Sequence, residues 1–107
     1  MTHNELMAML EETSLPIAYD HFAEGEAVEP PFITFLIPSS DNFSADGIVY
    51  LIVDVVHIEL YTDEKNPELE ELLEAVLDQH GIFYHKTEVW IESEKLYEVL
   101  YSFEMEV

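Results

Sequence analysis

The apolar positions of this chain recur with two periods, one typical of helices and one typical of strands. Near the N-terminus, Thr2 and Glu5 stand in capping-box relation and apolar residues follow at helical spacing, which predicts a helix over residues 3–13. A second helix is predicted between Asn66, a favourable N-cap that proline follows, and Gly81, a natural stop. Its apolar residues share one face, so it is expected to lie on a sheet. Four acidic residues are expected on its opposite face: Glu70, Glu71, Glu74 and Asp78.

Strand signals fill most of the remaining chain. Short strands are predicted over residues 17–22 and 32–37, and the acidic, proline-containing residues 23–31 between them predict a loop. Two alternating segments, 82–92 and 96–107, are separated by three polar residues and predict a β-hairpin. One face of its second strand is expected to be buried: Tyr97, Val99, Tyr101, Phe103 and Met105.

The segment over residues 48–61 carries the strongest strand signal and is apolar on both faces. Five even-numbered positions are expected to face the core: Tyr50, Ile52, Val56, Ile58 and Leu60. The opposite face carries four further apolar residues: Val49, Leu51, Val53 and Val55. A two-layer domain normally leaves one sheet face to solvent, so a loop or another subunit is expected to cover this second face.

Residues 38–47 are polar and turn-forming, and they are predicted to form the longest loop of the chain. They surround one large aromatic residue, Phe43. An aromatic anchor on a loop is typical of partner recognition, whereas the alternative is that Phe43 folds back as a hydrophobic plug on its own domain.

The predicted elements follow the order α-β-β-β-α-β-β. This order indicates an α+β fold, a two-layer sandwich in which an antiparallel or mixed twisted sheet carries two helices on one face. A length of 107 residues fits one core, so a single domain is expected over residues 1–107.

The chain carries 24 acidic residues against three lysines and no arginine, a formal net charge of −21. Such a surface repels phosphate groups, so direct binding of nucleic acid or of an anionic membrane is not expected. No segment approaches the roughly 20 apolar residues of a membrane-spanning helix, and no secretory signal is recognised, so the cytoplasm is the expected location. The sequence contains no cysteine, which excludes disulfides, thiolate catalysis and cysteine-based metal sites.

No constellation of residues predicts catalysis, and no cofactor is expected. Asp54 is the one acid inside segment 48–61, and three interpretations stay open: a perturbed pKa, a bulge or edge that meets water, and a polar contact at a subunit interface. Residues 41–47 lack the alternating ligands and closing glutamate of a calcium loop. Three histidines with Glu59 or Glu88 are weighed as metal ligands, but their spacing fits no known ligand pattern: His57, His80 and His85.

A net charge of −21 costs a small domain stability through self-repulsion, so the negative charge is expected to serve a purpose. One purpose is to line a passage through which DNA slides without sticking. The alternative is that of an anti-restriction inhibitor, which imitates DNA toward a basic nucleic-acid-binding enzyme. Imitation needs carboxylates along one elongated face, whereas here they are spread over helices, loops and hairpin, which favours the first purpose.

Short sequence phrases that recur in a known family are distributed along nearly the whole chain: residues 15–19, 30–33, 40–46, 58–62, 65–67, 88–92 and 97–104. They resemble a prophage family of small tail proteins of Gram-positive siphophages, which is similar to the tail-terminator or tail-completion proteins. The resemblance implies an α+β fold and a ring, usually a hexamer, that stops tube polymerisation and joins the tail to the head. It implies as partners further copies of the chain, the tail tube and the head-connector proteins. It also implies a location in the bacterial host cytoplasm during assembly and then in the virion tail.

Two candidate surfaces follow from these observations. A head-to-tail contact that closes after a fixed rotation forms a ring. The candidate subunit-interface residues are Val49, Leu51, Val53, Asp54, Val55, Trp90 and Tyr101. The candidate loop for docking the tube or the connector comprises Ser40, Asp41, Asn42, Phe43 and Asp46.

Overall fold

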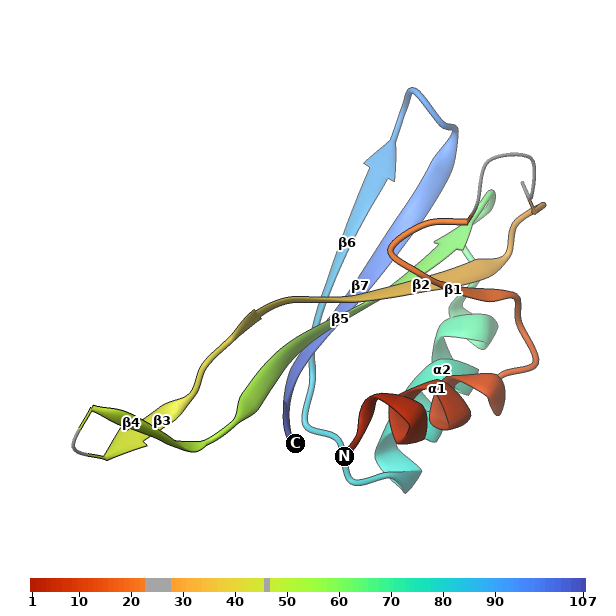
Figure 1. Cartoon of the computed structure of the whole chain (residues 1–107). Coiled ribbons are helices and arrows are strands. Elements are labelled where there is room, and N and C mark those ends of the chain that lie inside the picture. The colour runs from red at the N-terminus through yellow and green to blue at the C-terminus, as the bar shows by residue number, and fades with distance from the viewer. Residues whose placement is uncertain (23–27, 46) are drawn as a thin grey trace.

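The computed structural model describes residues 1–22, 28–45 and 47–107. Part of the loop expected over residues 23–31, and Asp46 of the candidate docking loop, therefore lie outside the described residues. The described chain forms two helices and seven strands (Figure 1). In chain order they are α1 (His3–Glu11), β1 (Ile17–Tyr19), β2 (Phe32–Ser40), β3 (Phe43–Ala45), β4 (Ile48–Leu51), β5 (Val53–Thr62), α2 (Pro67–Gln79), β6 (His85–Ile91) and β7 (Leu96–Glu106).

Both helices begin where the sequence predicts, because local capping groups fix their N-termini. Thr2 and Glu5 form the reciprocal capping box, with the Thr2 hydroxyl accepting from the Glu5 N–H at 3.1 Å. The Asn66 side chain accepts from the Leu69 N–H at 3.1 Å. Within the described residues, neither helix is long and apolar enough to cross a membrane.

Helix α1 ends at Glu11, two residues before the predicted end. The Thr13 hydroxyl donates to the Leu10 carbonyl oxygen at 2.8 Å, which satisfies one of the last free carbonyl groups of the helix. Ser14 then adopts a φ of 63°, a left-handed conformation that turns the chain toward β1. Side-chain bonding and backbone reversal thus end the helix earlier than its apolar spacing predicts.

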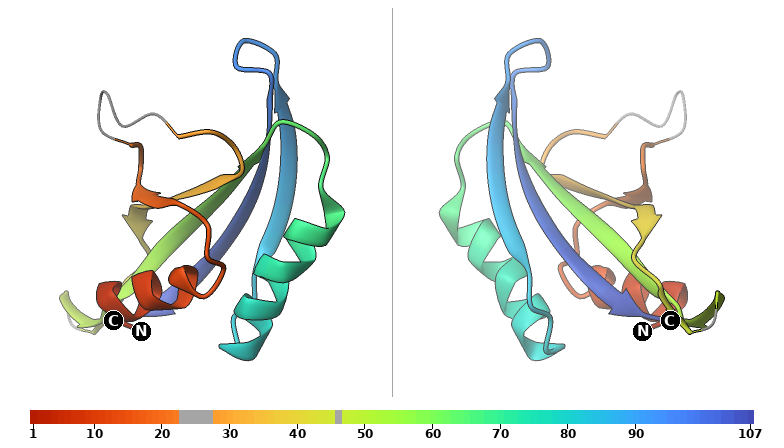
Figure 2. Two further views of the ribbon diagram at one scale, coloured as in Figure 1. Left: turned by 90° about the vertical axis from the view of Figure 1, so that its right-hand side faces the viewer. Right: turned by 90° about the vertical axis from the view of Figure 1, so that its left-hand side faces the viewer.

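Five strands form the main sheet in the order β1-β2-β5-β7-β6. Strand β1 is parallel to β2, whereas all other neighbours are antiparallel, so the sheet is mixed. The central strand β5 pairs with β7 along its whole length, from Val53 opposite Glu106 to Thr62 opposite Tyr97. Both helices cover the same face of this sheet (Figure 2). The predicted α+β fold with two layers is therefore confirmed.

One continuous core lies between the helices and the sheet. It joins the apolar faces of both helices to strands β2, β5 and β7: Leu6, Met9, Leu10, Ile33, Phe35, Val56, Ile58, Leu60, Leu73, Val76, Leu77, Val99, Tyr101, Phe103 and Met105. The predicted buried face of the last strand is confirmed from Val99 to Met105, and Tyr97 is half-buried. The periodicity of each element therefore predicts most of this core.

The loop predicted over residues 38–47 is instead a β-structured arm. Strand β2 continues to Ser40, and β3 and β4 pair as a separate hairpin that projects from one end of the sheet (Figure 1). Pro38 has no N–H to donate, and the register between β2 and β5 shifts between Leu36 and Ser39, so a bulge carries β2 past the proline. The observed element order is α-β-β-β-β-β-α-β-β, which corrects the predicted order.

The strand predicted over residues 48–61 breaks at Ile52, between β4 and β5. Val56, Ile58 and Leu60 of β5 are buried as predicted, but Ile52, which was expected to face the core, is exposed. The break at Ile52 interrupts the alternation before β5 begins, whereas β5 keeps one register from Val53 to Thr62, so the buried Val53 lies on the second face, opposite the core positions.

Replacing Ile58 with alanine is expected to lower the free energy of unfolding by about 2–5 kcal/mol, because a cavity would open between the sheet and the helices. Urea denaturation measures this loss. Ile48→Ala is the matched control: Ile48 is 71% exposed, so a change of less than about 0.5 kcal/mol is expected. Equal losses in the two variants would contradict the assignment of the core.

Candidate interaction surfaces

The candidate docking residues Ser40, Asp41 and Asn42 lie at the base of the arm. Ser40 ends β2 opposite Asp54 of β5. The Asp41 N–H donates to the Val53 carbonyl oxygen at 2.8 Å, and the Asn42 Oδ1 accepts from the Val53 N–H at 3.1 Å. These two bonds fix the direction in which the arm leaves the sheet.

The arm itself presents apolar side chains to solvent. Phe43 is 60% exposed, so it does not fold back as a plug on its own domain. Ile48 and Val49 of β4 are exposed as well, whereas Leu51, opposite Phe43, is half-buried. A group of exposed apolar side chains is typical of an interaction surface.

The candidate interface residues separate into a surface group and a core group. The surface group is exposed or half-buried: Val49, Leu51, Asp54, Val55 and Trp90. Val53 and Tyr101 belong to the core group, with exposed fractions of 6% and 0%. Their side chains are closed to a second subunit, and this part of the interface prediction is wrong. Val53 keeps the register of β5 and lies on the same face as Val55, where Asp41 and Asn42 at the base of the arm bond to its backbone, whereas the alternation of β7 points Tyr101 toward the helices.

Asp54 lies within the regular ladder between β5 and β7, opposite Met105. Its neighbours on both sides of the ladder keep the same register, so no bulge toward β7 explains an acid at this position. The Asp54 side chain is half-buried, and its polar contact with another subunit stays a prediction.

A network of ion pairs joins α2 to the sheet, and the sequence pattern did not predict these pairs. Lys86 of β6 places its Nζ 2.8 Å from both Glu70 Oε1 and Glu74 Oε2 on α2. Lys65 binds the other oxygen of Glu70 at 2.7 Å. Glu88, which also pairs with Lys65, and the Tyr101 hydroxyl, which donates to Glu74 at 2.7 Å, complete the network. We name this group the α2 ion cluster: Lys65, Glu70, Glu74, Lys86, Glu88 and Tyr101.

Glu70 is the buried centre of the α2 ion cluster, with an exposed fraction of 4%, although its place on the polar side of α2 predicts a solvated residue. Burial opposes ionisation, but hydrogen bonds from Lys65 and Lys86 outweigh it and hold the pKa of Glu70 below its ordinary value. For Glu74, burial is likewise outweighed by Lys86 and then by Tyr101, so its pKa is lowered too. Hydrogen bonds to both glutamates raise the pKa of Lys86. Glu70 and Glu74 are therefore carboxylates and Lys86 is an ammonium group at neutral pH.

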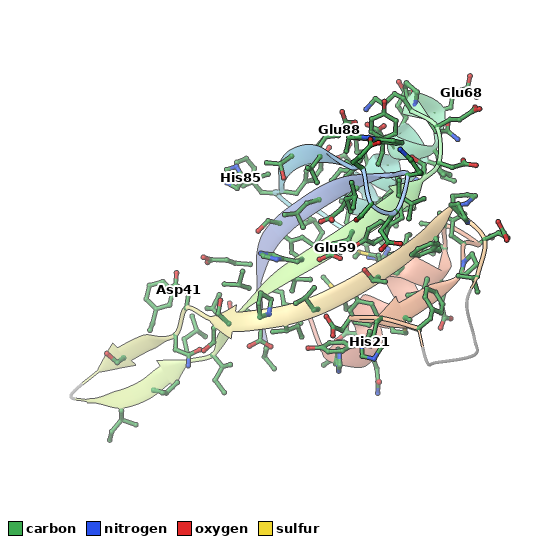
Figure 3. The ribbon with its side chains drawn as sticks, turned by 90° about the horizontal axis from the view of Figure 1, so that it is seen from above. His21, Asp41, Glu59, Glu68, His85 and Glu88 are labelled. Atoms are coloured by element: carbon green, nitrogen blue, oxygen red, sulfur yellow. The ribbon has the colours of Figure 1, made fainter. Side chains whose placement is uncertain are left out.

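A second polar group lies on the sheet face opposite the helices, where Figure 3 shows Glu59 on the central strand. Glu59 accepts hydrogen bonds from the Thr34 hydroxyl at 2.9 Å and from the Tyr61 hydroxyl at 2.7 Å. Burial, and then the charge of Glu59, raise the pKa of Glu98 on the neighbouring strand β7. The sheet therefore keeps two carboxyl groups close together at a cost in electrostatic energy.

A similar acidic pair lies where the arm leaves the sheet. Burial, and then the carboxyl group of Asp41, raise the pKa of Glu104 on β7. Figure 3 shows Asp41 beside the arm, away from the α2 ion cluster around Glu88. The two acidic pairs thus lie at different places along β7: Glu98 is opposite Tyr61, and Glu104 is opposite Val55.

The side chains that were weighed as metal ligands are dispersed. His80 lies 2.7 Å from Glu12, while His85 packs edge-to-face on Phe83 with ring centroids 5.3 Å apart. His57 is half-buried in β5. Among the described residues, no group of three or more histidine, aspartate or glutamate side chains is arranged to hold a metal ion.

A cleft of about 480 Å³ opens beside the start of β6. Phe83, His85, Phe103 and Glu104 line parts of it. Phe83 is 81% exposed, so an aromatic ring stands free at the rim of the cleft. Neither this ring nor the adjoining strand edge is predicted by the sequence pattern.

Comparison with known proteins identifies a shared fold. No family model matches the sequence, and no curated protein matches it. A chain in a solved structure described as the virion of a native gene transfer agent (GTA) particle matches in three dimensions, with a TM-score of 0.62 and 13% sequence identity. The match covers 95% of this chain and 83% of that chain. At this identity the likeness shows the fold alone, over nearly the whole chain.

Glu70→Gln is expected to lower the free energy of unfolding at neutral pH by about 1–3 kcal/mol, because it removes the charged acceptor shared by Lys65 and Lys86. Since the folded-state pKa of Glu70 is lowered, its contribution is present above the ordinary value of 4.5 and is lost as the pH falls below it. The difference in Tm between wild type and variant should therefore shrink from neutral pH to about pH 3.

Glu71→Gln is the matched control on the same helix, since Glu71 is exposed and lies outside the α2 ion cluster. Its Tm should stay close to that of the wild type. A Glu70→Gln difference that stays constant across the pH range would contradict a stabilising charge at Glu70.

Glu98→Gln is expected to raise Tm at neutral pH, because it removes a charge that burial and Glu59 disfavour. The corresponding gain in the free energy of unfolding is about 1 kcal/mol or less. The folded-state pKa of Glu98 is raised, so this cost is present above that pKa and vanishes as the pH falls below the ordinary value of 4.5. Thermal melts of both proteins should coincide at about pH 3. Glu94→Gln, in the exposed turn between β6 and β7, controls for the loss of one charge. A lower Tm for Glu98→Gln at neutral pH would show that its carboxylate is stabilising.

Proposed function

We propose that this chain is a structural protein of a phage-like virion. The observation that carries the proposal is the fold shared over 95% of the chain with a chain of the GTA virion structure. The role is one of assembly rather than catalysis: the described surface offers an apolar arm and an acidic sheet face in place of a convergent catalytic group.

Within the virion, the proposed role is to cap or complete the tail tube and to join it to the head connector. The resemblance of residues 40–46 and 97–104 to small siphophage tail proteins supports this position. A ring, with six copies as the expected number, is the assembly that fits the end of a tube. The partners are then other copies of the chain, tube proteins and connector proteins, met first in the host cytoplasm and then in the virion tail.

The acidic pairs support a position beside a DNA passage. Glu59 with Glu98, and Asp41 with Glu104, keep negative charges close together although this disfavours folding. A wall of carboxylates repels phosphate groups, so DNA passes without forming contacts that would stall it. An inhibitor that imitates DNA would use the same charge differently and would bind a basic nuclease.

The decisive experiment deletes the gene from the phage-like element that carries it and images the particles by electron microscopy. The expected result is heads and tails that remain unjoined, or tails of uncontrolled length, with rescue by the wild-type gene supplied separately. Intact joined particles without the gene would overturn the proposal. Tight binding of the purified protein to a basic nuclease would favour DNA imitation instead.

Association of the purified protein is expected to strengthen with salt, because screening weakens the repulsion between copies that each carry a net charge of −21. Size-exclusion chromatography with light scattering, at low and high NaCl and several protein concentrations, measures the mass. A species near six subunits that grows with salt supports the ring. A mass that falls with salt would contradict an assembly limited by charge repulsion.

A further inference from the structure

The exposed apolar side chains of this protein gather at two places. Seven of the ten large hydrophobic residues exposed in the described chain belong to two groups. The arm group comprises Phe43, Ile48, Val49 and Ile52. The edge group comprises Phe83, Val89 and Trp90, on or next to β6. Such concentration on a small acidic surface indicates two contact sites.

Strand β6 is also an open edge of the main sheet. It is the last strand in the order β1-β2-β5-β7-β6, and in the described residues only β7 pairs with it. Charged side chains often protect such an edge from added strands. Here Lys86 and Glu88 are engaged in the α2 ion cluster, which leaves Val89 exposed on the edge strand. The edge is therefore accessible to backbone pairing by another strand.

Along their own sequence both contact segments are poor in negative charge, although Glu98 of β7 lies opposite Val89 and Glu104 lines the cleft beside Phe83. Residues 42–53 contain one charged residue, Asp46, and β6 contains one lysine and one glutamate. Two copies that each carry −21 repel one another over most of their surfaces. The repulsion is weakest where these two segments meet, which selects a second copy as the occupant.

The arm and β6 lie on opposite sides of the sheet (Figure 2). One copy therefore presents its arm in one direction and its open edge in the other, which is the arrangement of a head-to-tail contact. We infer that the β3–β4 arm of one copy lies along the β6 edge of the next copy, with its apolar side chains against Phe83 and Val89. This inference names the contact within the ring of the proposed function and rests on that ring.

Crosslinking tests the contact, and the natural absence of cysteine makes every introduced thiol unique. The double variant Ile48→Cys/Val89→Cys, treated with a short bismaleimide in high salt, is expected to give a ladder of covalent multimers. Ile48→Cys/Ala8→Cys is the matched control, because Ala8 is exposed on α1 and outside both contact sites. It should give no ladder.

Single variants separate this contact from other modes of association. If Ile48→Cys alone and Val89→Cys alone each form efficient dimers, like surfaces meet, these contacts explain any ladder of the double variant, and the inference is wrong. Absence of every intermolecular product in the double variant at all salt concentrations also overturns it. The deletion phenotype is independent of both results, so the proposed virion role can stand when the arm-to-edge contact fails.

A charge introduced on the arm provides a second measurement. Ile48→Asp is expected to weaken self-association about tenfold or more, since it removes a buried apolar contact between copies. Ala8→Asp adds the same charge on α1 and should change the association far less. Equal effects would mean that net charge, rather than contact by the arm, controls assembly.

Discussion

Beside its apolar face, α2 is fastened to the sheet by one buried carboxylate, Glu70, held between two lysines. Burying an ion is costly, and the cost is offset only when its partners are close and its oxygens are all bonded. Both oxygens of Glu70 meet an ammonium group here, and Lys86 also neutralises Glu74 one turn later. The cluster thereby places Lys86 on β6 and Tyr101 on β7 at fixed positions under the helix.

Because the chain has only three positive side chains, the α2 ion cluster also determines how charge is distributed over the molecule. Two of the three lysines serve the α2 ion cluster, and Lys95 pairs with Glu92 in the turn between β6 and β7. All lysines therefore lie on the side of α2, β6 and β7. The face of the sheet opposite the helices keeps the negative charge of Glu59, Glu98 and Glu104 without neutralisation by lysine, and this asymmetry orients the molecule with respect to an anionic polymer.

The sequence predicts those features that depend on neighbours along the chain. Caps at Thr2 and Asn66, the apolar face of α2 and the alternation of β7 all follow from spacing, because their causes lie within a few residues. The arm could not be predicted in this way, since polar residues after Pro38 continue a strand only because β5 pairs with them. Glu70 looked like one of several solvated acids, and nothing local distinguishes it from Glu71. The two candidate interface residues that are buried differ in their position: Val53 lies on the second face of β5 where the base of the arm bonds to it, and Tyr101 lies on the core face of β7.

The strand order has a consequence for folding during synthesis of the chain. The central strand β5 has one neighbour, β2, that precedes it in the chain and another, β7, that follows it only after α2 and β6. Until β7 is inserted, β5 lacks half of its hydrogen bonds and β6 has no place in the sheet. Contacts between distant segments form late because closing the intervening chain costs entropy. A chain that ends before β7 therefore exposes the unpaired edge of β5 and lacks the strand that places β6, so the main sheet becomes complete only when β7 is inserted.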